Sequence, residues 1–288
     1  MKKQKKAIVT LIIGIKYVEM FEKYCRKNWQ DYSDKHSYDL IVLKDSIDNS
    51  QRSLSRSIAW QKLLILSQSW SQDYEQIVWI DSDVVINSKN APCVASLVPI
   101  QKIGGVETYS IPSKDIYKAS QKRSFDRIDD FSNFIKCPTP ESFYINRGIP
   151  GHGIQEVLQT GMFVCSPKFH RDLLENIYFN YEDNHGGHYC YEMPAMSYEV
   201  IKNDKVFWLS PLFNFCVHDI IFGYYAFLFE KEHYSILERI YNKILKIFNP
   251  NHNVIKNYEL KRNAIKTILE NSYFTHFAGA TDKMRFLN

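Results

Sequence analysis

The chain has 288 residues and a mass of 34.0 kDa, with 45% hydrophobic, 24% charged and 15% aromatic residues. These proportions exclude disorder throughout, and the high aromatic content favours a large core or grooves that bind sugars or bases. The net charge of +4 is matched by four lysines among the first six residues, so the rest is nearly neutral and a nucleic-acid partner is not expected.

The N-terminus has two interpretations. Residues 2–6 are mostly lysine and precede nine mostly apolar residues, 7–15, as in a signal peptide. No small-residue cleavage site follows, however, and the β-branched run suits a buried strand, so we expect a strand. Nothing else approaches the roughly 20 apolar residues of a membrane span, and no two of the six cysteines form a CxxC pair. We therefore expect a soluble cytoplasmic protein with reduced thiols.

Strand and helix patterns alternate through the first half of the chain. Residues 7–15, 39–43 and 76–80 have the apolar runs of buried strands, and residues 18–29 and 57–70 repeat apolar side chains at helical spacing. Such alternation implies crossover connections and a mostly parallel sheet with helices on both faces. The sequence thus predicts an α/β fold.

The middle of the chain is more irregular. Residues 104–109 have a strand pattern, and residues 110–150, rich in Pro, Ser and charge, predict long loops with one short helix. Such a stretch in a compact domain is often a loop that faces the substrate. A strand at 159–165 then leads into a helix that Pro167 opens and that extends to residue 179.

The last third changes character. We expect a loop at 184–189, a helix at 191–202, a strand at 206–209, helices at 222–248 and 258–271, and a strand at 273–277. The two late helices mix Lys and Glu with aromatic and aliphatic residues, which could contact a membrane surface, although packing on the body is favoured. No internal repeat is visible. One domain over residues 1–288, with a helical C-terminal segment at 222–271, is the expected organisation.

An acidic pair, Asp81-Ser82-Asp83, directly follows the predicted strand QIVWI at residues 76–80. Ligands bind at the carboxyl ends of strands in open α/β sheets. Two carboxylates there can hold Mg²⁺ or Mn²⁺, which would neutralise a diphosphate leaving group. A plain turn is the alternative, since Asp and Ser also begin turns. Acids after an apolar strand are nevertheless costly unless they are paired or used, so a catalytic role is favoured.

Two enzyme classes carry such a segment. Haloacid-dehalogenase-type phosphatases have an apolar strand followed by Asp-x-Asp-x-[Thr/Val], in which Asp81 would be the nucleophile, and GT-A glycosyltransferases have an Asp-x-Asp that binds metal and nucleotide-sugar diphosphate. The phosphatase motif normally ends the first strand and needs a later acidic motif, for which Asp129-Asp130 is the one candidate. Because the pair here follows the third predicted strand, the transferase is favoured.

The sequence resembles GT-A fold glycosyltransferases, especially the group of glycogenin and bacterial lipopolysaccharide galactosyl- and glucosyltransferases, over about residues 7–285. This resemblance implies a Rossmann-like nucleotide-binding fold. It implies a Mn²⁺ or Mg²⁺ ion held by Asp81, Asp83 and His276, the last from the segment YFTHFAG at 273–279. Gly279 and Lys283 would hold the diphosphate, with Lys283 one place later than in the family.

Further site residues follow from the same resemblance. Lys62, on the helix before the acidic pair, would contact diphosphate or sugar unless it is simply solvated, and Ser82 lies within the donor-binding motif. Gly161, in QTGMFV at 159–164, would let donor or acceptor approach the backbone.

The acid of the family's Asp-Gln segment is replaced by Glu192. Glu192 would be the general base in an inverting enzyme, or would orient the acceptor in a retaining one. Asn214, at the end of LSPLFN, is a further candidate.

The resemblance implies a hexosyltransferase of polysaccharide biosynthesis. It would move a sugar from a UDP-sugar to a glycan or lipid-linked acceptor, with the base near Tyr17 and the acceptor entering past residues 110–155 and 184–192. A non-catalytic carbohydrate-binding relative is the other alternative, against which the retained Asp81, Asp83 and His276 argue.

Overall fold

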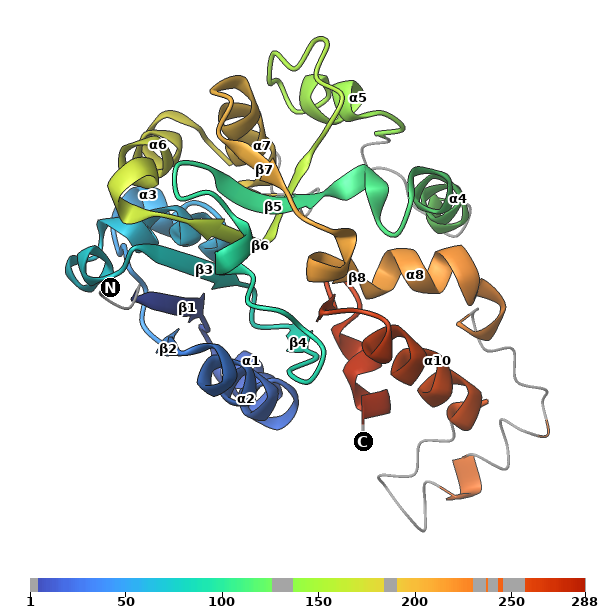
Figure 1. Ribbon diagram of the computed structural model, residues 1–288. Helices are drawn as coiled ribbons and strands as arrows, with labels where there is room; N and C mark the ends of the chain where they lie inside the picture. Colours follow the sequence, from blue (N-terminus) through green and yellow to red (C-terminus); the bar gives the residue numbers. More distant parts are fainter. Residues whose placement is uncertain are drawn as a thin grey trace.

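Six strands form the central sheet of the computed structural model, which describes residues 5–125, 137–183, 191–229, 237, 243–245 and 257–287. The sheet order is β2-β1-β3-β6-β5-β7 (Figure 1). The strands are β1 (Lys6–Leu11), β2 (Tyr38–Leu43), β3 (Gln76–Ile80), β5 (Ile103–Glu107), β6 (Leu158–Cys165) and β7 (Val206–Trp208).

Most of the sheet is parallel, as the alternating pattern predicts. Strand β1 is parallel to β2 and β3, and β5 is parallel to β7, whereas β6 runs antiparallel to both β3 and β5. The antiparallel strand β6 brings Gly161 beside the end of β3. There the backbone N–H of Asp81 donates a hydrogen bond to the Gly161 carbonyl at 2.8 Å.

Helices cover both faces of the sheet. Helices α1 (Ile15–Tyr24) and α2 (Arg26–His36) contribute to the core on one face. The 3₁₀ helix η1 (Ile58–Ser67), α6 (Pro167–Asn180) and α7 (Met193–Lys202) contribute to the core on the other. The remaining helices are α3 (Gln51–Leu54), α4 (Lys114–Phe125), α5 (Pro140–Ile145), α8 (Val217–Tyr224) and α10 (Tyr258–Glu270), with 3₁₀ turns η2 (Ser69–Asp73), η3 (Ala95–Leu97), η4 (Thr108–Ser110), η6 (Pro211–Asn214), η7 (Ala226–Leu228) and η8 (Thr281–Leu287).

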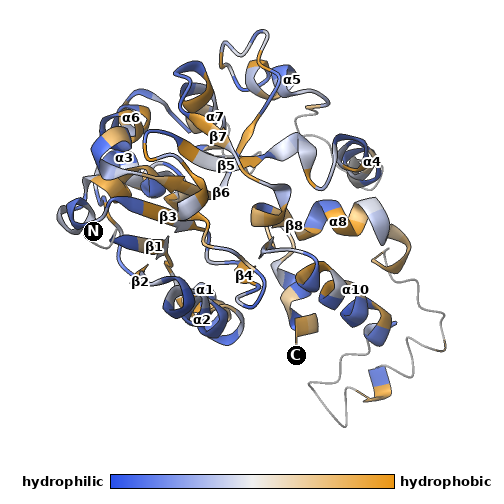
Figure 2. Cartoon of the chain, in the orientation of Figure 1, coloured by the Kyte–Doolittle hydropathy of each residue, from blue (hydrophilic) through white to orange (hydrophobic). Residues whose placement is uncertain are grey.

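The central strands are apolar on both sides because each faces two cores. Successive side chains of a strand point to opposite faces, so Ile8 and Val78 join the core beneath α1 and α2, while Val9 and Ile77 join the other. In Figure 2 the hydrophobic colour is concentrated in the strands, and peripheral helices such as α4 carry hydrophilic colour. Burial on both faces explains the continuous apolar runs in the sequence.

A second, small sheet carries the C-terminal part of the site. It contains β4 (Val84–Ile86), β9 (Phe274–His276) and β8 (Phe215–Cys216), in the order β4-β9-β8. Strands β4 and β9 are antiparallel and place Val84 opposite His276. This pairing, which the sequence pattern did not predict, joins the segment after the acidic pair to the end of the chain.

Several predicted elements differ in detail. The single helix expected at 18–29 is two helices that meet at Cys25, where the rings of Phe21 and Trp29 pack edge to face 5.1 Å apart. The segment at 57–70 is the 3₁₀ helix η1 followed by the short η2, not an amphipathic α-helix. Residues Trp60 to Leu66 are all buried, because η1 packs between the sheet and α6. The amphipathic helix expected from the spacing of apolar residues at 57–70 was therefore wrong.

Other segments were only partly predicted. The described residues of the 110–150 region include two helices, α4 and α5, where one short helix was expected. Helix α8 begins before residue 222 and ends at Tyr224, so the helix predicted from 222 is not continuous there. Most of that predicted helix, the loop at 184–189 and the Asp129-Asp130 pair lie outside the described residues. Within the described part of the chain, none of the helices has the length and hydrophobicity to cross a membrane.

Candidate functional site

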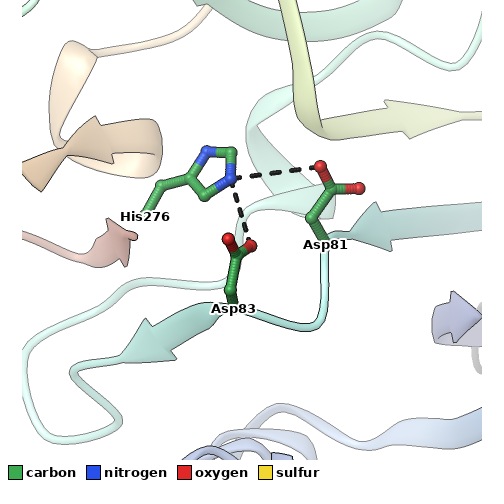
Figure 3. A group of neighbouring side chains, drawn as sticks. All are labelled: Asp81, Asp83 and His276. Carbon is green, nitrogen blue, oxygen red and sulfur yellow. Dashed lines mark ion pairs between the residues drawn. The ribbon is translucent and has the colours of Figure 1, made fainter. Parts of the chain in front are cut away.

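Three side chains from distant parts of the sequence meet beyond the end of β3. Asp81 follows β3, Asp83 precedes β4, and His276 ends β9 (Figure 3). The Nε2 atom of His276 lies 3.2 Å from Asp83 Oδ1 and 3.9 Å from Asp81 Oδ2. One ligand atom from each residue lies within 4.8 Å of the others. The three residues that the sequence identifies as metal ligands are therefore within reach of one ion.

Backbone hydrogen bonds hold this arrangement. Residues 81–84 form a turn in which the N–H of Val84 donates to the Asp81 carbonyl at 3.2 Å, and the N–H of Phe277 donates to the Asp83 carbonyl at 3.1 Å. From the other side, the indole N–H of Trp29 on α2 donates to the Val84 carbonyl at 2.7 Å. Both carboxylates thus project from backbone that is fixed on two sides.

Asp83 and His276 form an ion pair in which the imidazole is buried and the carboxylate is half-buried. Burial by itself raises the pKa of an acid and lowers that of an imidazole. Here the attraction between the two groups outweighs burial, so the pKa of Asp83 lies below its ordinary value and that of His276 above it. A divalent cation at this place would take the position of the imidazolium proton, because a metal ligand must be deprotonated.

A buried lysine links the first aspartate to Glu192. The ammonium of Lys62 lies 3.0 Å from Asp81 Oδ1 and 2.9 Å from Glu192 Oε1. It also donates to the Thr160 carbonyl at 3.3 Å. Burial lowers the pKa of Lys62, but the two carboxylates outweigh this and raise it overall. Lys62 is therefore a charged structural partner of the acids, not a solvated residue.

Glu192 lies behind this lysine. Its side chain is only 3% exposed, and its Oε1 atom accepts hydrogen bonds from both Lys62 and the Thr160 hydroxyl, the latter at 2.7 Å. Burial raises the pKa of Glu192, and Lys62 offsets part of that rise. A general base must reach the proton it abstracts. The contacts of Glu192 thus support a role through Lys62 more directly than contact with an acceptor.

The imidazole of His276 is also held from its far side. Its Nδ1 atom lies 2.8 Å from Oδ1 of Asn214, and the amide nitrogen of Asn214 donates to Gln159 Oε1 at 2.7 Å. Gly161 makes room for the ring, since a Cβ atom there would lie 2.2 Å from His276 Cε1. The glycine expected to admit a substrate thus admits the histidine in this structure.

A cavity of about 190 Å³ opens beside the acidic pair. Its lining combines the charged residues Lys62, Asp81 and Asp83 and the hydroxyls of Ser82 and Thr281 with apolar and aromatic side chains, which are Leu11, Tyr17, Met20, Ile58, Ala59 and Trp79. The cavity thus joins apolar and aromatic surface to charged groups. Lys62, Ser82 and Tyr17, which the sequence analysis assigns to the donor, all line it.

The two remaining donor-site candidates lie elsewhere. Gly279 has a left-handed backbone (φ 64°) in the segment after β9, and only Thr281 of that segment lines the cavity. The ammonium of Lys283 contacts Asp282 at 2.5 Å and lies 5.9 Å from the ring of Phe229. The described structure thus does not bring Gly279 or Lys283 to the cavity.

Sequence reasoning overlooked several members of the site. Trp79 donates its indole N–H to Asp81 Oδ1 at 2.7 Å, and Thr160 and Gln159 contact Glu192 and Asn214. The contact of Trp79 with Asp81 could have been predicted, because residues two apart along an extended strand point to the same face. The partners of Gln159 and Thr160 could not be inferred, because they come from elements far away in the chain.

A second cavity, also about 190 Å³, lies at the start of α7. Aromatic residues Trp60, Tyr181 and Tyr191 line it together with Arg147, Gly148, Ile149, Asn180, Glu182, Pro194 and Ala195. Tyr191, Pro194 and Ala195 flank Glu192 in the sequence, and Trp60 lies two residues from Lys62. This cavity therefore adjoins the segments that carry the Lys62–Glu192 pair.

Comparison with known proteins identifies the fold. No family model matches the chain, and no curated protein sequence matches it. Among solved structures, the apo form of the bifunctional glycosyltransferase WbbM aligns with a TM-score of 0.50 and 12% identity over 98% of this chain and 49% of that one. This chain thus spans about half the length of WbbM.

Two other glycosyltransferase structures are also similar. A glycosyltransferase involved in glycosylation of the major capsid of PBCV-1 aligns with a TM-score of 0.49 and 12% identity over 97% of this chain and 98% of that one. The galactosyltransferase LgtC, in complex with donor and acceptor sugar analogues, aligns at 0.45 and 11% over 98% and 94%. At 12% identity the alignment with WbbM concerns the fold alone, and it confirms the GT-A-type α/β fold expected from the sequence.

Proposed function

We propose that the protein is a metal-dependent glycosyltransferase that moves a sugar from a nucleotide-sugar donor, with UDP as the nucleotide, to a hydroxyl of a glycan or lipid-linked acceptor. The observation that carries the proposal is the convergence of Asp81, Asp83 and His276 next to a cavity in a glycosyltransferase fold. Residues 1–288 would act as one catalytic unit.

The three candidate ligand side chains fit Mn²⁺ or Mg²⁺. Two carboxylates and an imidazole face one another, and carboxylate oxygens suit both ions while imidazole also suits Mn²⁺. Oδ1 of Asp81 already accepts from Trp79 and Lys62, which leaves Oδ2 toward His276. When bound, such an ion supplies Lewis-acid stabilisation of a departing diphosphate.

The protein's own residues would do the rest. Tyr17, Met20 and Ile58 offer apolar surface to the base of the nucleotide, and Ser82 lines the same cavity. Lys62 and Glu192 keep Asp81 in place through the contacts described above. Gly279 and Lys283 would join the donor site only if the segment after β9 moved.

The second cavity supports the acceptor side. Its aromatic residues Trp60, Tyr181 and Tyr191 present ring surface with polar groups beside it, which suits a sugar. Gly148 and Ile149 belong to the 110–155 region, and Tyr191 to the 184–192 region, through which the sequence analysis expects the acceptor to enter. We therefore place the acceptor in this cavity.

The test is release of the nucleoside diphosphate from a panel of nucleotide sugars with and without Mn²⁺. Asp83→Ala and His276→Ala should each lower metal-dependent turnover at least about a hundredfold, since several kcal/mol of charge stabilisation would be lost. Full turnover in both variants would overturn the proposed site.

A matched control is available on the surface. Asp172→Ala removes an aspartate whose side chain is 85% exposed, and turnover should not change. Circular dichroism checks that each variant is folded. If the protein instead hydrolyses a phosphomonoester, and Asp81→Asn abolishes this, the phosphatase alternative holds. Binding of sugars without any turnover would indicate a carbohydrate-binding protein.

A further inference from the structure

We propose that Gln159 and Asn214 are positioning residues that fix the tautomer of His276, with hydrogen on Nδ1 and the Nε2 lone pair directed at the acidic pair. The inference rests on the proposed function, because it concerns His276 as a ligand of a divalent cation. It assigns roles to two residues that neither the motif nor the fold explains.

The hydrogen bond between Gly161 and Gln159 has a direction that cannot vary. The backbone N–H of Gly161 can only donate a hydrogen bond, and it points to the terminal amide of Gln159. The atom of Gln159 that receives it must therefore be the oxygen, Oε1. Exchange of the two amide atoms would place an NH₂ group against the N–H of Gly161.

The next link follows from the first. The same Oε1 atom lies 2.7 Å from the amide of Asn214, and an oxygen can only accept. Asn214 must therefore present its NH₂ group to Gln159, because the opposite orientation would bring two carbonyl oxygens together. The orientation of the Asn214 amide is thus set by the backbone of β6, two residues beyond Gln159.

The last link fixes the histidine. With its NH₂ group used, Asn214 presents Oδ1 to His276 Nδ1 at 2.8 Å. That oxygen accepts, so Nδ1 must carry a hydrogen, and in the neutral ring Nε2 carries the lone pair. Nε2 is the atom that lies 3.2 Å from Asp83 and 3.9 Å from Asp81. A neutral imidazole in this tautomer can ligate a cation between the acids.

The hydrogen bonds from Gly161 through Gln159 and Asn214 to His276 are called the relay below. Burial makes the orientation of His276 depend on this relay. Asn214 is fully buried and His276 is 2% exposed, so water cannot replace a lost hydrogen bond or turn the ring. The ring also packs against Gly161, in space that a Cβ atom there would fill. Groups that hold the far nitrogen of a ligating histidine commonly affect metal affinity in this way.

Two substitutions at Gln159 separate the relay from simple packing. Gln159→Glu retains an oxygen that accepts from Gly161 and Asn214, so Mn²⁺ affinity should stay within about threefold of the unmodified protein. Gln159→Met has a similar length but no acceptor, and should weaken Mn²⁺ binding roughly 10- to 100-fold. Free Mn²⁺, measured by electron paramagnetic resonance during titration without nucleotide, gives both affinities. Equal affinity in the two variants would overturn the proposal.

Asn214→Leu removes the link next to His276 and should also weaken Mn²⁺ binding roughly 10- to 100-fold. Its matched control is Asn203→Leu, at the exposed residue after α7, where the amide nitrogen donates to the carbonyl and carboxylate of Glu199; there the affinity should not change. If Asn214→Leu does not fold, the comparison of Gln159→Glu with Gln159→Met still tests the proposal. Unchanged affinity in folded Asn214→Leu would contradict the relay.

The tautomer itself can be observed. In the Mg²⁺-loaded protein, a long-range ¹H–¹⁵N spectrum should show His276 with hydrogen on Nδ1, and the same Nδ1–H should be present without metal. A spectrum with bare Nδ1 would overturn the relay. Failure of the unmodified protein to bind Mn²⁺ would overturn the proposed function instead, and the Nδ1–H signal of the metal-free protein would still test the relay.

Discussion

At the residue scale, Lys62 shows how far a buried charge depends on its partners. Its side chain is 4% exposed and lies between Asp81 and Glu192 at hydrogen-bonding distance from both. Desolvation of three charged groups is costly, and the attraction among them offsets it only while all are present. Lys62 thus contributes both to the stability of the fold and to the orientation of Asp81.

Lys62→Met should therefore destabilise the protein by about 3–5 kcal/mol, because two acids would be left beside each other without a cation. Combining it with Glu192→Gln should recover part of that loss, since one unpaired charge is removed. Urea unfolding measures both effects. As a control, Lys202→Met removes a 56% exposed lysine at the end of α7 and should change stability by less than about 0.5 kcal/mol. Additive losses in the double variant would refute the coupling.

Residue-level chemistry was the most predictable part of the site. Asp81 and Asp83 stand out because carboxylates directly follow an apolar strand, where they are costly unless used, whereas His276 was expected only from the resemblance to GT-A glycosyltransferases. Lys62 was identified as well, but its burial was not, since Ser57 to Trp70 reads as a helix with one polar face. The partners that bury Lys62 come from β3 and from the start of α7, and no local pattern shows them.

At the scale of elements, the contact between α4 and α8 contains an unusual buried acid. Asp219, in the first turn of α8, is 6% exposed and accepts hydrogen bonds from Ser120 and Gln121 of α4, both at 3.2 Å. Burial raises its pKa, although neighbouring His218 and these donors offset part of the rise. An acid whose pKa is higher in the folded state binds its proton more tightly there, so its ionisation opposes folding.

Asp219→Asn should consequently stabilise the protein at pH 8 and have little effect below about pH 3, where the acid is protonated in the folded and unfolded states alike. The amide keeps Oδ1 for Ser120 and Gln121, so the contact between the helices is preserved. Thermal unfolding at several pH values provides the measurement. A destabilised variant at pH 8 would mean that the charge itself holds the two helices together.

Helices and strands were predicted well where each lies within one apolar run. They were predicted less well where packing against distant segments determines the type of helix and its burial. The strands β1, β2, β3 and β6 follow from continuous apolar segments. The 3₁₀ helix η1 was predicted as an amphipathic helix because its polar residues resemble a solvated face. In the fold those residues have internal partners: Gln61 accepts from the backbone N–H groups of Ile47 and Asp48, and Lys62 binds two acids.

At the scale of the whole molecule, the site joins two sheets. Asp81 extends from the central sheet, while Asp83 and His276 flank the pairing of β4 with β9 in the small one. A cation bound by all three would link the end of β3 to the end of the chain. Because such an ion binds the folded state and not the unfolded one, it should raise stability.

Mn²⁺ at a hundredfold excess over its dissociation constant should stabilise the protein by about 2.7 kcal/mol, which corresponds to a rise in Tm of several degrees. Thermal shift with and without EDTA measures this without any substrate. His276→Ala should remove the metal-dependent rise, whereas His152→Ala should keep it. An equal rise in His276→Ala would show that the ion binds elsewhere.

The sequence by itself determined the class of fold, most of the central strands and the acidic pair of the candidate site, because these depend on apolar runs and on which residues end them; His276 was expected from the resemblance to GT-A glycosyltransferases. Only the tertiary structure decided that Lys62 is buried with Glu192, that Gly161 accommodates the His276 ring, and that Gln159 and Asn214 orient it. Each of these contacts joins residues that are distant in the chain. They arise from strand order and from the antiparallel direction of β6, which local periodicity does not encode.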